Sequence, residues 1–291
     1  MKTFTPAEQA VLQILAYAAV FGGSVQKQDL TRFQTAPANF SSTQLLQAST
    51  SLWESGVVRS VDVSRQILTA QEKWQQVGQA VQFLRRFPQI ESIWVTGSLA
   101  VGNIQSDDDI DLMIVTARES LWWTRTMVAA RDIFARKIRR RHDENGQLQD
   151  KWCCNLWLES GSLQLPLSQR SLYSAREVIQ AVPVFQRKAG AVGDFLTANA
   201  WVTQYLPEGF VSAQEQAKNL PAWSDSQNFS LPRFLRRHLN HLLFSFQKKR
   251  MQAYRRHEIV EINRAFFHPG ERAKIVQQEY ERILRFLGIS L

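Results

Sequence analysis

The sequence predicts an α+β protein built around a mixed sheet, and three observations lead to this prediction. Apolar residues recur at helical spacing through most of the first 70 residues. Between residues 91 and 165, β-rich runs alternate with one long helical segment, as expected for a sheet covered by helices. After residue 166 the pattern is helical almost to the end of the chain. We therefore expect a first unit over 1–70, a connecting helix over 71–90, a core over 91–165 and a helical region over 166–291.

The composition excludes several classes of protein. With 291 residues, 44% of them apolar and 21% charged, the chain can bury a substantial core and does not resemble a disordered segment. The longest apolar stretches fall short of the roughly 18–20 residues that cross a bilayer, and the first residues lack the layout of a signal peptide. The two cysteines, Cys153 and Cys154, are adjacent and poorly placed for a disulfide, so we expect buried thiols and a cytoplasmic protein without membrane contact. A net charge of +9 favours polyanionic partners.

The first 70 residues predict three helices followed by a β-hairpin, an order that resembles a winged helix. The candidate recognition helix, Thr43–Glu54, contains no Lys or Arg to meet phosphates, so docking or dimerisation is favoured over DNA binding. The helices are expected from Thr5-Pro6 to the Gly22-Gly23 break, over Ser24–Phe33, and from Ser41-Ser42 to Gly56, and the strands over Val57–Val63 and Gln66–Thr69.

The rest of the chain supplies the predicted core and its C-terminal cover. Helices are expected over Gln71–Phe87, Leu121–Arg141, Ser171–Gln180, Ala191–Leu206, Leu231–Arg256 and Gly270–Leu287. Strands are expected over Glu91–Thr96, Ile110–Val115 and Trp152–Glu159.

The segment that indicates a function contains two carboxylates, those of Asp109 and Asp111. Side chains alternate between the faces of a strand, so Asp109 and Asp111 point to one side while Ile110 and its apolar neighbours point to the other. Two carboxylates held this close repel each other, and a hard divalent cation such as Mg²⁺ removes that cost. The Gly97-Ser98 turn ends the preceding strand, where free backbone N–H groups and a hydroxyl can hold phosphate oxygens.

Gly97-Ser98 followed by Asp109-Ile110-Asp111 between two apolar runs resembles the signature of the DNA polymerase β-type nucleotidyltransferase superfamily. The resemblance covers about 25 residues and implies an enzyme that transfers a nucleoside monophosphate from a nucleoside triphosphate (NTP) to an acceptor hydroxyl, with release of pyrophosphate. It also implies that Gly97 and Ser98 contact the triphosphate, and that Asp109 and Asp111 hold two Mg²⁺ ions, or Mn²⁺ in their place.

The resemblance further implies a third carboxylate on a later strand. Asn155 occupies the matching place in Trp152–Glu159, and a neutral amide is a poorer ligand and no base. Glu159 has the same strand parity but lies roughly 13 Å further along, so it serves only if the strand bulges or the register differs. Asp150, just before the strand, is the other alternative, and a site with only two carboxylates, or an inactive one, also remains open.

Basic clusters bear on the acceptor. Arg136–Arg141 is expected to end the long helix, and residues 231–291 hold 13 Lys and Arg against 5 Asp and Glu. This charge suits RNA or the triphosphate, and the acceptor is left open among RNA, protein and small molecules. The alternative function is a catalytically silent nucleotide-binding or DNA-binding regulator. An antitoxin-like transferase is less favoured, because such proteins normally lack flanking regions.

Overall fold

The computed structural model describes residues 3–58, 64–139, 149–223, 232–252, 258–267 and 272–289. Its helices are α1 Pro6–Ala19, α2 Ser42–Glu54, α3 Ser64–Leu84, α4 Gly97–Ala100, α5 Leu121–Ala135, α6 Leu172–Gln180, α7 Ala191–Ala198, α8 Pro207–Lys218, α9 Arg233–Gln252 and α10 Arg272–Leu287. Its strands are β1 Ile90–Val95, β2 Ile110–Thr116, β3 Trp152–Glu159, β4 Val182–Gln186, β5 Ile259–Val260 and β6 Arg264–Phe266. The α+β class with a mixed sheet is confirmed.

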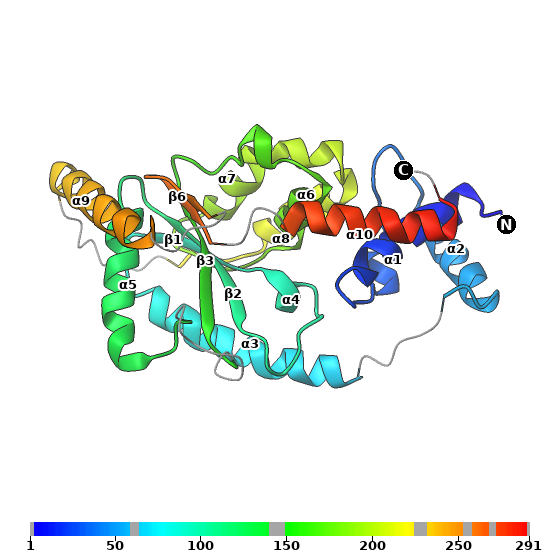
Figure 1. The fold of residues 1–291 in the computed structure, drawn as a ribbon, viewed down its shortest axis with the longest axis horizontal. Helices are drawn as coiled ribbons and strands as arrows, with labels where there is room; N and C mark the ends of the chain where they lie inside the picture. The colour runs from blue at the N-terminus through cyan, green and yellow to red at the C-terminus, as the bar shows by residue number, and fades with distance from the viewer. Residues whose placement is uncertain are drawn as a thin grey trace.

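One six-stranded sheet organises the molecule, with the strand order β4-β1-β2-β3-β6-β5 (Figure 1). The pair β2 and β3 is parallel, and the other neighbouring pairs are antiparallel. Because β2 and β3 run in the same direction, their first residues lie side by side at one end of the strands. The carboxylate strand and the strand expected to carry the third ligand are therefore direct neighbours.

Each face of the sheet is covered by its own set of helices (Figure 1). On one face, Ile110, Leu112 and Ile114 pack with buried residues of α3 and α5. On the other face, Met113 and Val115 belong to a hydrophobic cluster that includes buried residues of α6, α7 and α8 and continues into α10, α1 and α2. The strict alternation along β2 separates two hydrophobic cores, and Asp111 belongs to the second face by parity.

Three of the six strands come from the region expected to be purely helical. β4 follows α6 and forms one edge of the sheet beside β1, while β6 pairs with β3 and β5 with β6. The prediction of a wholly helical region 166–291 is therefore corrected for these residues. The strands are short, and β4 contains Pro183, which a sheet tolerates at its edge.

The N-terminal unit differs from the expected winged helix. Residues 66–69, predicted as the second strand of a hairpin, lie inside α3, so that prediction is wrong. Helix-favouring residues continue through this segment, and the buried Val77, Ala80 and Leu84 follow helical spacing. Ser24–Phe33 forms only a 3₁₀ turn over Lys27–Asp29 with flanking turns, and residues 59–63 lie outside the described residues.

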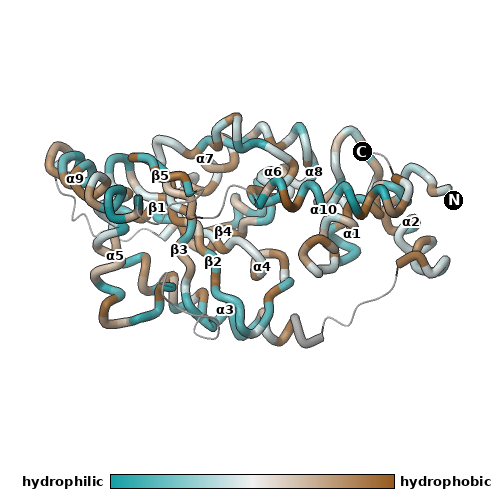
Figure 2. Tube along the Cα trace, in the orientation of Figure 1, coloured by the Kyte–Doolittle hydropathy of each residue, from teal (hydrophilic) through white to brown (hydrophobic). Residues whose placement is uncertain are grey.

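The N-terminal helices share a core with the C-terminal helix α10. The ring of Tyr17 in α1 meets that of Tyr280 in α10 at 5.4 Å in an edge-on contact, and the Arg176 guanidinium of α6 lies 4.0 Å from the centre of the Tyr17 ring. Polar and apolar residues alternate along α10 in Figure 2, with Val276, Tyr280 and Leu284 on its buried side. The first unit is thus packed onto the domain through the same hydrophobic core, while the four-part division of the chain stays a prediction.

The long central helix is shorter than expected. α5 ends at Ala135, because Arg136 adopts a left-handed conformation with φ of 50°. The basic run that begins at Arg136 therefore does not end the helix as predicted. Its described part, residues 136–139, turns back toward the start of β3, where Ile138 forms a bridge with Trp152.

Candidate active site

The two predicted carboxylates lie where β2 begins. Asp111 is the second residue of β2 and Asp109 immediately precedes the strand. Ile110 and Leu112 are fully buried on the opposite face, which leaves both carboxylates on the face that carries Met113. The side chain of Asp109 is 15% exposed, and the pair lies at the end of the sheet where β2 begins.

The Gly97 turn lies directly against Asp111. Gly97 has φ of 67°, and a Cβ placed on it would lie 2.3 Å from Oδ2 of Asp111. The backbone N–H of Thr96 also donates to the Asp111 carbonyl oxygen at 3.0 Å. Any side chain at position 97 would displace the carboxylate, so only glycine permits this close approach. The turn and the carboxylates, twelve to fourteen residues apart in sequence, are one structural unit.

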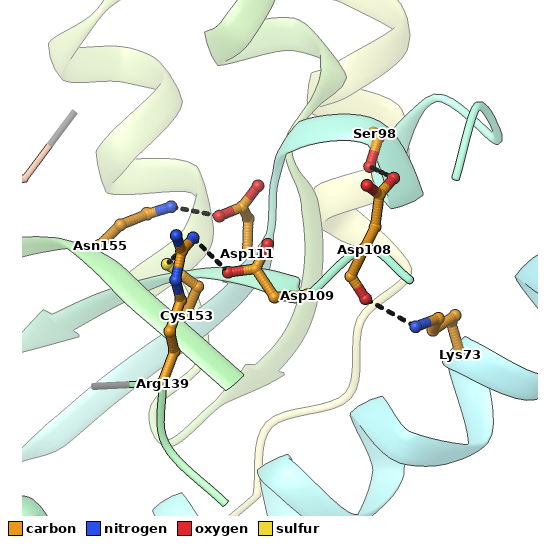
Figure 3. Close-up of polar contacts among 8 residues, drawn as sticks. All are labelled: Lys73, Ser98, Asp108, Asp109, Asp111, Arg139, Cys153 and Asn155. Atoms are coloured by element: carbon orange, nitrogen blue, oxygen red, sulfur yellow. Dashed lines mark hydrogen bonds and ion pairs between the residues drawn. The ribbon is translucent and has the colours of Figure 1, made fainter. Parts of the chain in front are cut away.

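The side chain of Ser98 forms a hydrogen bond with the acidic loop that precedes β2. Its hydroxyl donates to Oδ2 of Asp108 at 3.2 Å, and the same oxygen accepts from the backbone N–H of Gln105 at 2.9 Å (Figure 3). Asp108 therefore shapes the loop between the turn and β2.

Lys73 supports this loop from α3 and was not singled out from the sequence. Its side chain is 3% exposed, and its Nζ donates to the carbonyl oxygens of Ser106 and Asp108 at 2.9 and 2.6 Å. It also forms an ion pair with Asp150 at 3.1 Å. Asp150, weighed as a third metal ligand, is thus engaged with Lys73. The only signal in the sequence was a lysine within an amphipathic helix, which normally indicates a solvated residue.

A β-bulge in β3 decides the surroundings of the carboxylates. Asp111 pairs with Cys153 and Leu112 with Cys154, but Met113 pairs with Leu156, which leaves Asn155 as the extra residue. The amide of Asn155 donates from Nδ2 to Oδ1 of Asp111 (Figure 3). Asn155 therefore lies beside the carboxylates, at the place where the resemblance implies a third one.

The bulge sends Glu159 to the other face of the sheet. Its Oε1 accepts from the backbone N–H groups of Ser120 and Leu121 at 3.0 and 3.2 Å, and its Oε2 from that of Glu119 at 2.9 Å. These groups form the start of α5, where free N–H groups favour a carboxylate. The expectation that Glu159 shares a face with Asn155 is wrong, and its place at the start of α5 gives it a structural role.

The two cysteines point to opposite faces. The Sγ of Cys153 and one oxygen each of Asp109 and Asp111 lie within 4.8 Å of one another, and both cysteines are free thiols. Cys154 packs in the core of the opposite face, beside the buried Arg125. Burial raises the pKa of Cys154 to about 12, and burial together with the charges of Asp111 and Asp109 raises that of Cys153 further. Both thiols are only partly buried, and both are protonated at neutral pH.

The electrostatics of the pair favour a cation. Burial, followed by the charge of Asp109, raises the pKa of Asp111 to about 7. Asp109 already has one positive neighbour, because Nη1 of Arg139 lies 2.7 Å from its Oδ2. The buried, closely spaced oxygens of Asp109 and Asp111 fit a divalent cation, and Mg²⁺ is commonly held by one or two carboxylates with phosphates and water completing its shell.

Comparison with known proteins identifies a family for the central part of the chain. Residues 77–179 match the model of the nucleotidyltransferase domain family, from the middle of α3 to the end of α6. No curated protein and no solved structure matches the chain. Among the described residues, no helix is both long and apolar enough to span a bilayer. Residues 77–179 are a nucleotidyltransferase domain, consistent with the DNA polymerase β-type superfamily.

Proposed function

We propose that this protein transfers a nucleoside monophosphate from an NTP to an acceptor hydroxyl. The observation that carries the proposal is the close approach of Gly97 to Asp111, since a Cβ at position 97 would lie 2.3 Å from the carboxylate. It brings a turn suited to phosphate oxygens against a pair of carboxylates suited to a divalent cation.

In this proposal one pair of residues binds the triphosphate and another pair binds the divalent cation. Gly97 and Ser98 contact the triphosphate, and Asp109 and Asp111 hold the divalent cation, with Mg²⁺ preferred and Mn²⁺ acceptable. A cation bound there supplies positive charge to the phosphate oxygens at the reacting centre. Lys73 maintains the loop that aligns Asp108 and Asp109, through its contacts with two loop carbonyls.

The reaction is an in-line displacement at the α-phosphorus. The acceptor oxygen forms a bond to the α-phosphorus while the bond from that atom to the oxygen leading to the β-phosphate breaks. Pyrophosphate leaves with the bonding electron pair, and the hydroxyl proton passes to solvent water. Asn155 cannot accept this proton, because a neutral amide is no base.

A silent nucleotide-binding regulator is the second candidate, and Asn155 favours it. The amide donates to Asp111 at the place of the third carboxylate and removes one group that could activate an acceptor. This alternative retains NTP binding at Gly97 and Ser98 but predicts no transfer.

The class of acceptor is open, and the basic helix α9 offers a surface that could bind an anionic acceptor. Arg233–Gln252 contains no Asp or Glu, and Arg237, Lys249 and Arg250 are exposed. The charge favours an anionic acceptor such as RNA through non-specific phosphate contacts. Protein side chains and small molecules are tested as acceptors in the same experiment.

The test is transfer of label from each α-³²P NTP in Mg²⁺, with RNA, cell protein or small hydroxyl compounds as acceptors. The wild type is compared with Asp109→Ala/Asp111→Ala and with Asp107→Ala/Asp194→Ala, which removes two exposed carboxylates, one in the same loop and one in α7. Transfer by the wild type and the control alone supports the transferase. NTP binding without transfer supports the silent regulator, and the absence of both contradicts both functions.

A further inference from the structure

Arg139 is a built-in cation of the site. Its backbone N–H donates to the carbonyl oxygen of Trp152 at 3.0 Å, and the Trp152 N–H donates to the carbonyl oxygen of Lys137 at 2.8 Å. The buried Asp132 accepts from the N–H groups of Lys137 and Ile138 at 2.8 and 3.0 Å. The strand and the buried carboxylate thus fix the backbone from which Arg139 extends.

The guanidinium lies among the donor atoms that would surround a metal ion. Nη1 of Arg139 is 2.7 Å from Oδ2 of Asp109 and 4.0 Å from Sγ of Cys153 (Figure 3). The side chain is 41% exposed, so part of the guanidinium fork is open to an incoming anion. An arginine guanidinium can donate two parallel hydrogen bonds to two oxygens of one phosphate.

The site offers few free carboxylate oxygens for two divalent cations beside Arg139. Among the described residues, the side chains that could hold a metal ion here are two carboxylates, those of Asp109 and Asp111, and the free thiol of Cys153. Asn155 contributes a neutral amide that donates to Asp111, so one oxygen of that carboxylate is already engaged. One oxygen of Asp109 is likewise engaged by Arg139.

We propose that the site binds one divalent cation and that Arg139 supplies the second positive charge to the reacting phosphate. The inference rests on the proposed function for its substrate, an NTP, but the number of cations can be measured by itself. In two-metal sites the ions lie about 3.5–4 Å apart and clamp the attacking and leaving oxygens. Here the guanidinium takes one of these places without gaining or losing a proton. The bonds made and broken are unchanged.

The test counts Mn²⁺ on the full chain by electron paramagnetic resonance, with and without α,β-methylene NTPs, which cannot be cleaved between the first two phosphates. One Mn²⁺ per chain with the spectrum of an isolated ion is expected. Two ions per chain with a spin-coupled spectrum would overturn the inference, whether or not the nucleotide binds. A single bound Mn²⁺ without nucleotide binding would support the count and instead contradict the proposed function.

A double variant sharpens the count. Asn155→Asp combined with Arg139→Gln restores a carboxylate and removes the competing cation, so two coupled Mn²⁺ ions are expected. Arg136→Gln is the matched control in the same segment and keeps one ion. One ion in the folded double variant would contradict the assignment of Arg139 and Asn155. Thermal melting shows whether the double variant folds. If it does not fold, the number of Mn²⁺ ions bound by the wild type still tests the inference.

The charge of Arg139 is tested separately from its shape. Arg139→Lys keeps the positive charge and is expected to bind the methylene nucleotide within a few-fold of the wild type. Arg139→Gln should bind it about tenfold more weakly, as expected when one charge-assisted phosphate contact is lost. Equal affinities of the Gln variant and the wild type would contradict a phosphate-facing role.

Discussion

Asp111, which is half-buried, and Glu159, which is buried, are acidic residues on neighbouring parallel strands, yet they have different surroundings. Asp111 has a neighbouring carboxylate, Asp109, and one amide donor, Asn155. Glu159 accepts three backbone N–H groups at the start of α5, and burial still raises its pKa above the usual value despite these donors. Glu159 thus has three backbone donors for its carboxylate, whereas Asp111 has a like charge beside it and fewer donors.

The difference teaches that burial alone does not identify a functional carboxylate. What matters is whether the protein itself supplies the donors that stabilise the charged form. Glu159 has its donors from the backbone, so its hydrogen bonds to the start of α5 are part of the fold. Asp111 has a like charge beside it, so an external cation would stabilise its charged form. Variants at these positions should therefore separate function from stability.

The largest expected effect is on transfer in Asp111→Asn. Removing a metal-binding carboxylate should lower the rate by at least about 10³-fold, because several kcal/mol of charge stabilisation depend on the cation. The free energy of unfolding should stay unchanged or rise, since the repulsion with Asp109 is removed. Label transfer and thermal melting measure the two quantities. Asp107→Asn, on the exposed part of the same loop, is the control, and equal loss in both variants would refute the distinction.

Gly97→Ala should give the next largest loss. The new Cβ would meet the Asp111 carboxylate at 2.3 Å, so Asp111 must move, and we expect transfer to fall by about 10²-fold because catalytic geometry tolerates little displacement. Gly102→Ala is a matched control, because Gly102 has φ of 72° but nothing within 4 Å of a new Cβ. Both variants carry the same backbone strain, and only the first should lose Mn²⁺ affinity. Similar losses in both would assign the effect to strain.

Glu159→Gln should have the reverse pattern to Asp111→Asn. Loss of a charged acceptor for three N–H groups at a helix start should destabilise the protein by about 1–2 kcal/mol, with Mn²⁺ binding unchanged. Urea unfolding measures the first quantity and paramagnetic resonance the second. Glu208→Gln, an exposed acidic residue in the first turn of α8, should cost much less. A loss of Mn²⁺ binding in Glu159→Gln would return Glu159 to the list of metal ligands.

Much of the site could be predicted from the sequence because its signals are local. The parity of Asp109 and Asp111 follows from strand alternation, and the glycine turn follows from the end of an apolar run. The structure places Gly97 against Asp111, as expected for one phosphate and metal site. Whether these residues bind nucleotide and metal stays a prediction.

The remainder depends on long-range contacts that leave no local pattern. Nothing in Trp152–Glu159 marks the bulge at Asn155, so the face of Glu159 could not be derived from alternation. Strands as short as β5 and β6 show no periodicity of their own and form only because β3 offers an edge. Arg139 was one cation in a basic run, and only the bridge between Ile138 and Trp152 brings it to Asp109.

A further predicted effect is a pH dependence of cation binding. The pKa of Asp111 rises from its ordinary value of 3.8 to about 7, chiefly through burial and then through Asp109. Cations bind the deprotonated form, so Mn²⁺ affinity should fall about tenfold per pH unit below 7 and level off above it. Cys153, Glu177 and Arg272 also influence Asp111, and burial raises the pKa of Glu177 to about 7 as well, so both carboxyl groups contribute to the change in this range. An affinity that is constant between pH 5.5 and 8 would contradict the raised pKa.

The same shift has a definite sign for stability without metal. Between pH 3.8 and 7 the folded protein keeps a proton on Asp111 that the unfolded chain has released, so the free energy of unfolding falls as the pH rises through this window. Asp111→Asn cannot titrate and should show a shallower decline over that range. Glu159→Gln tests the contrast, since burial raises the pKa of Glu159 as well while its N–H donors oppose the shift, and its removal should flatten the slope less. Equal slopes in wild type and Asp111→Asn would mean that Asp111 is already ionised at low pH, and the cation would then have no unfavourable charge to relieve.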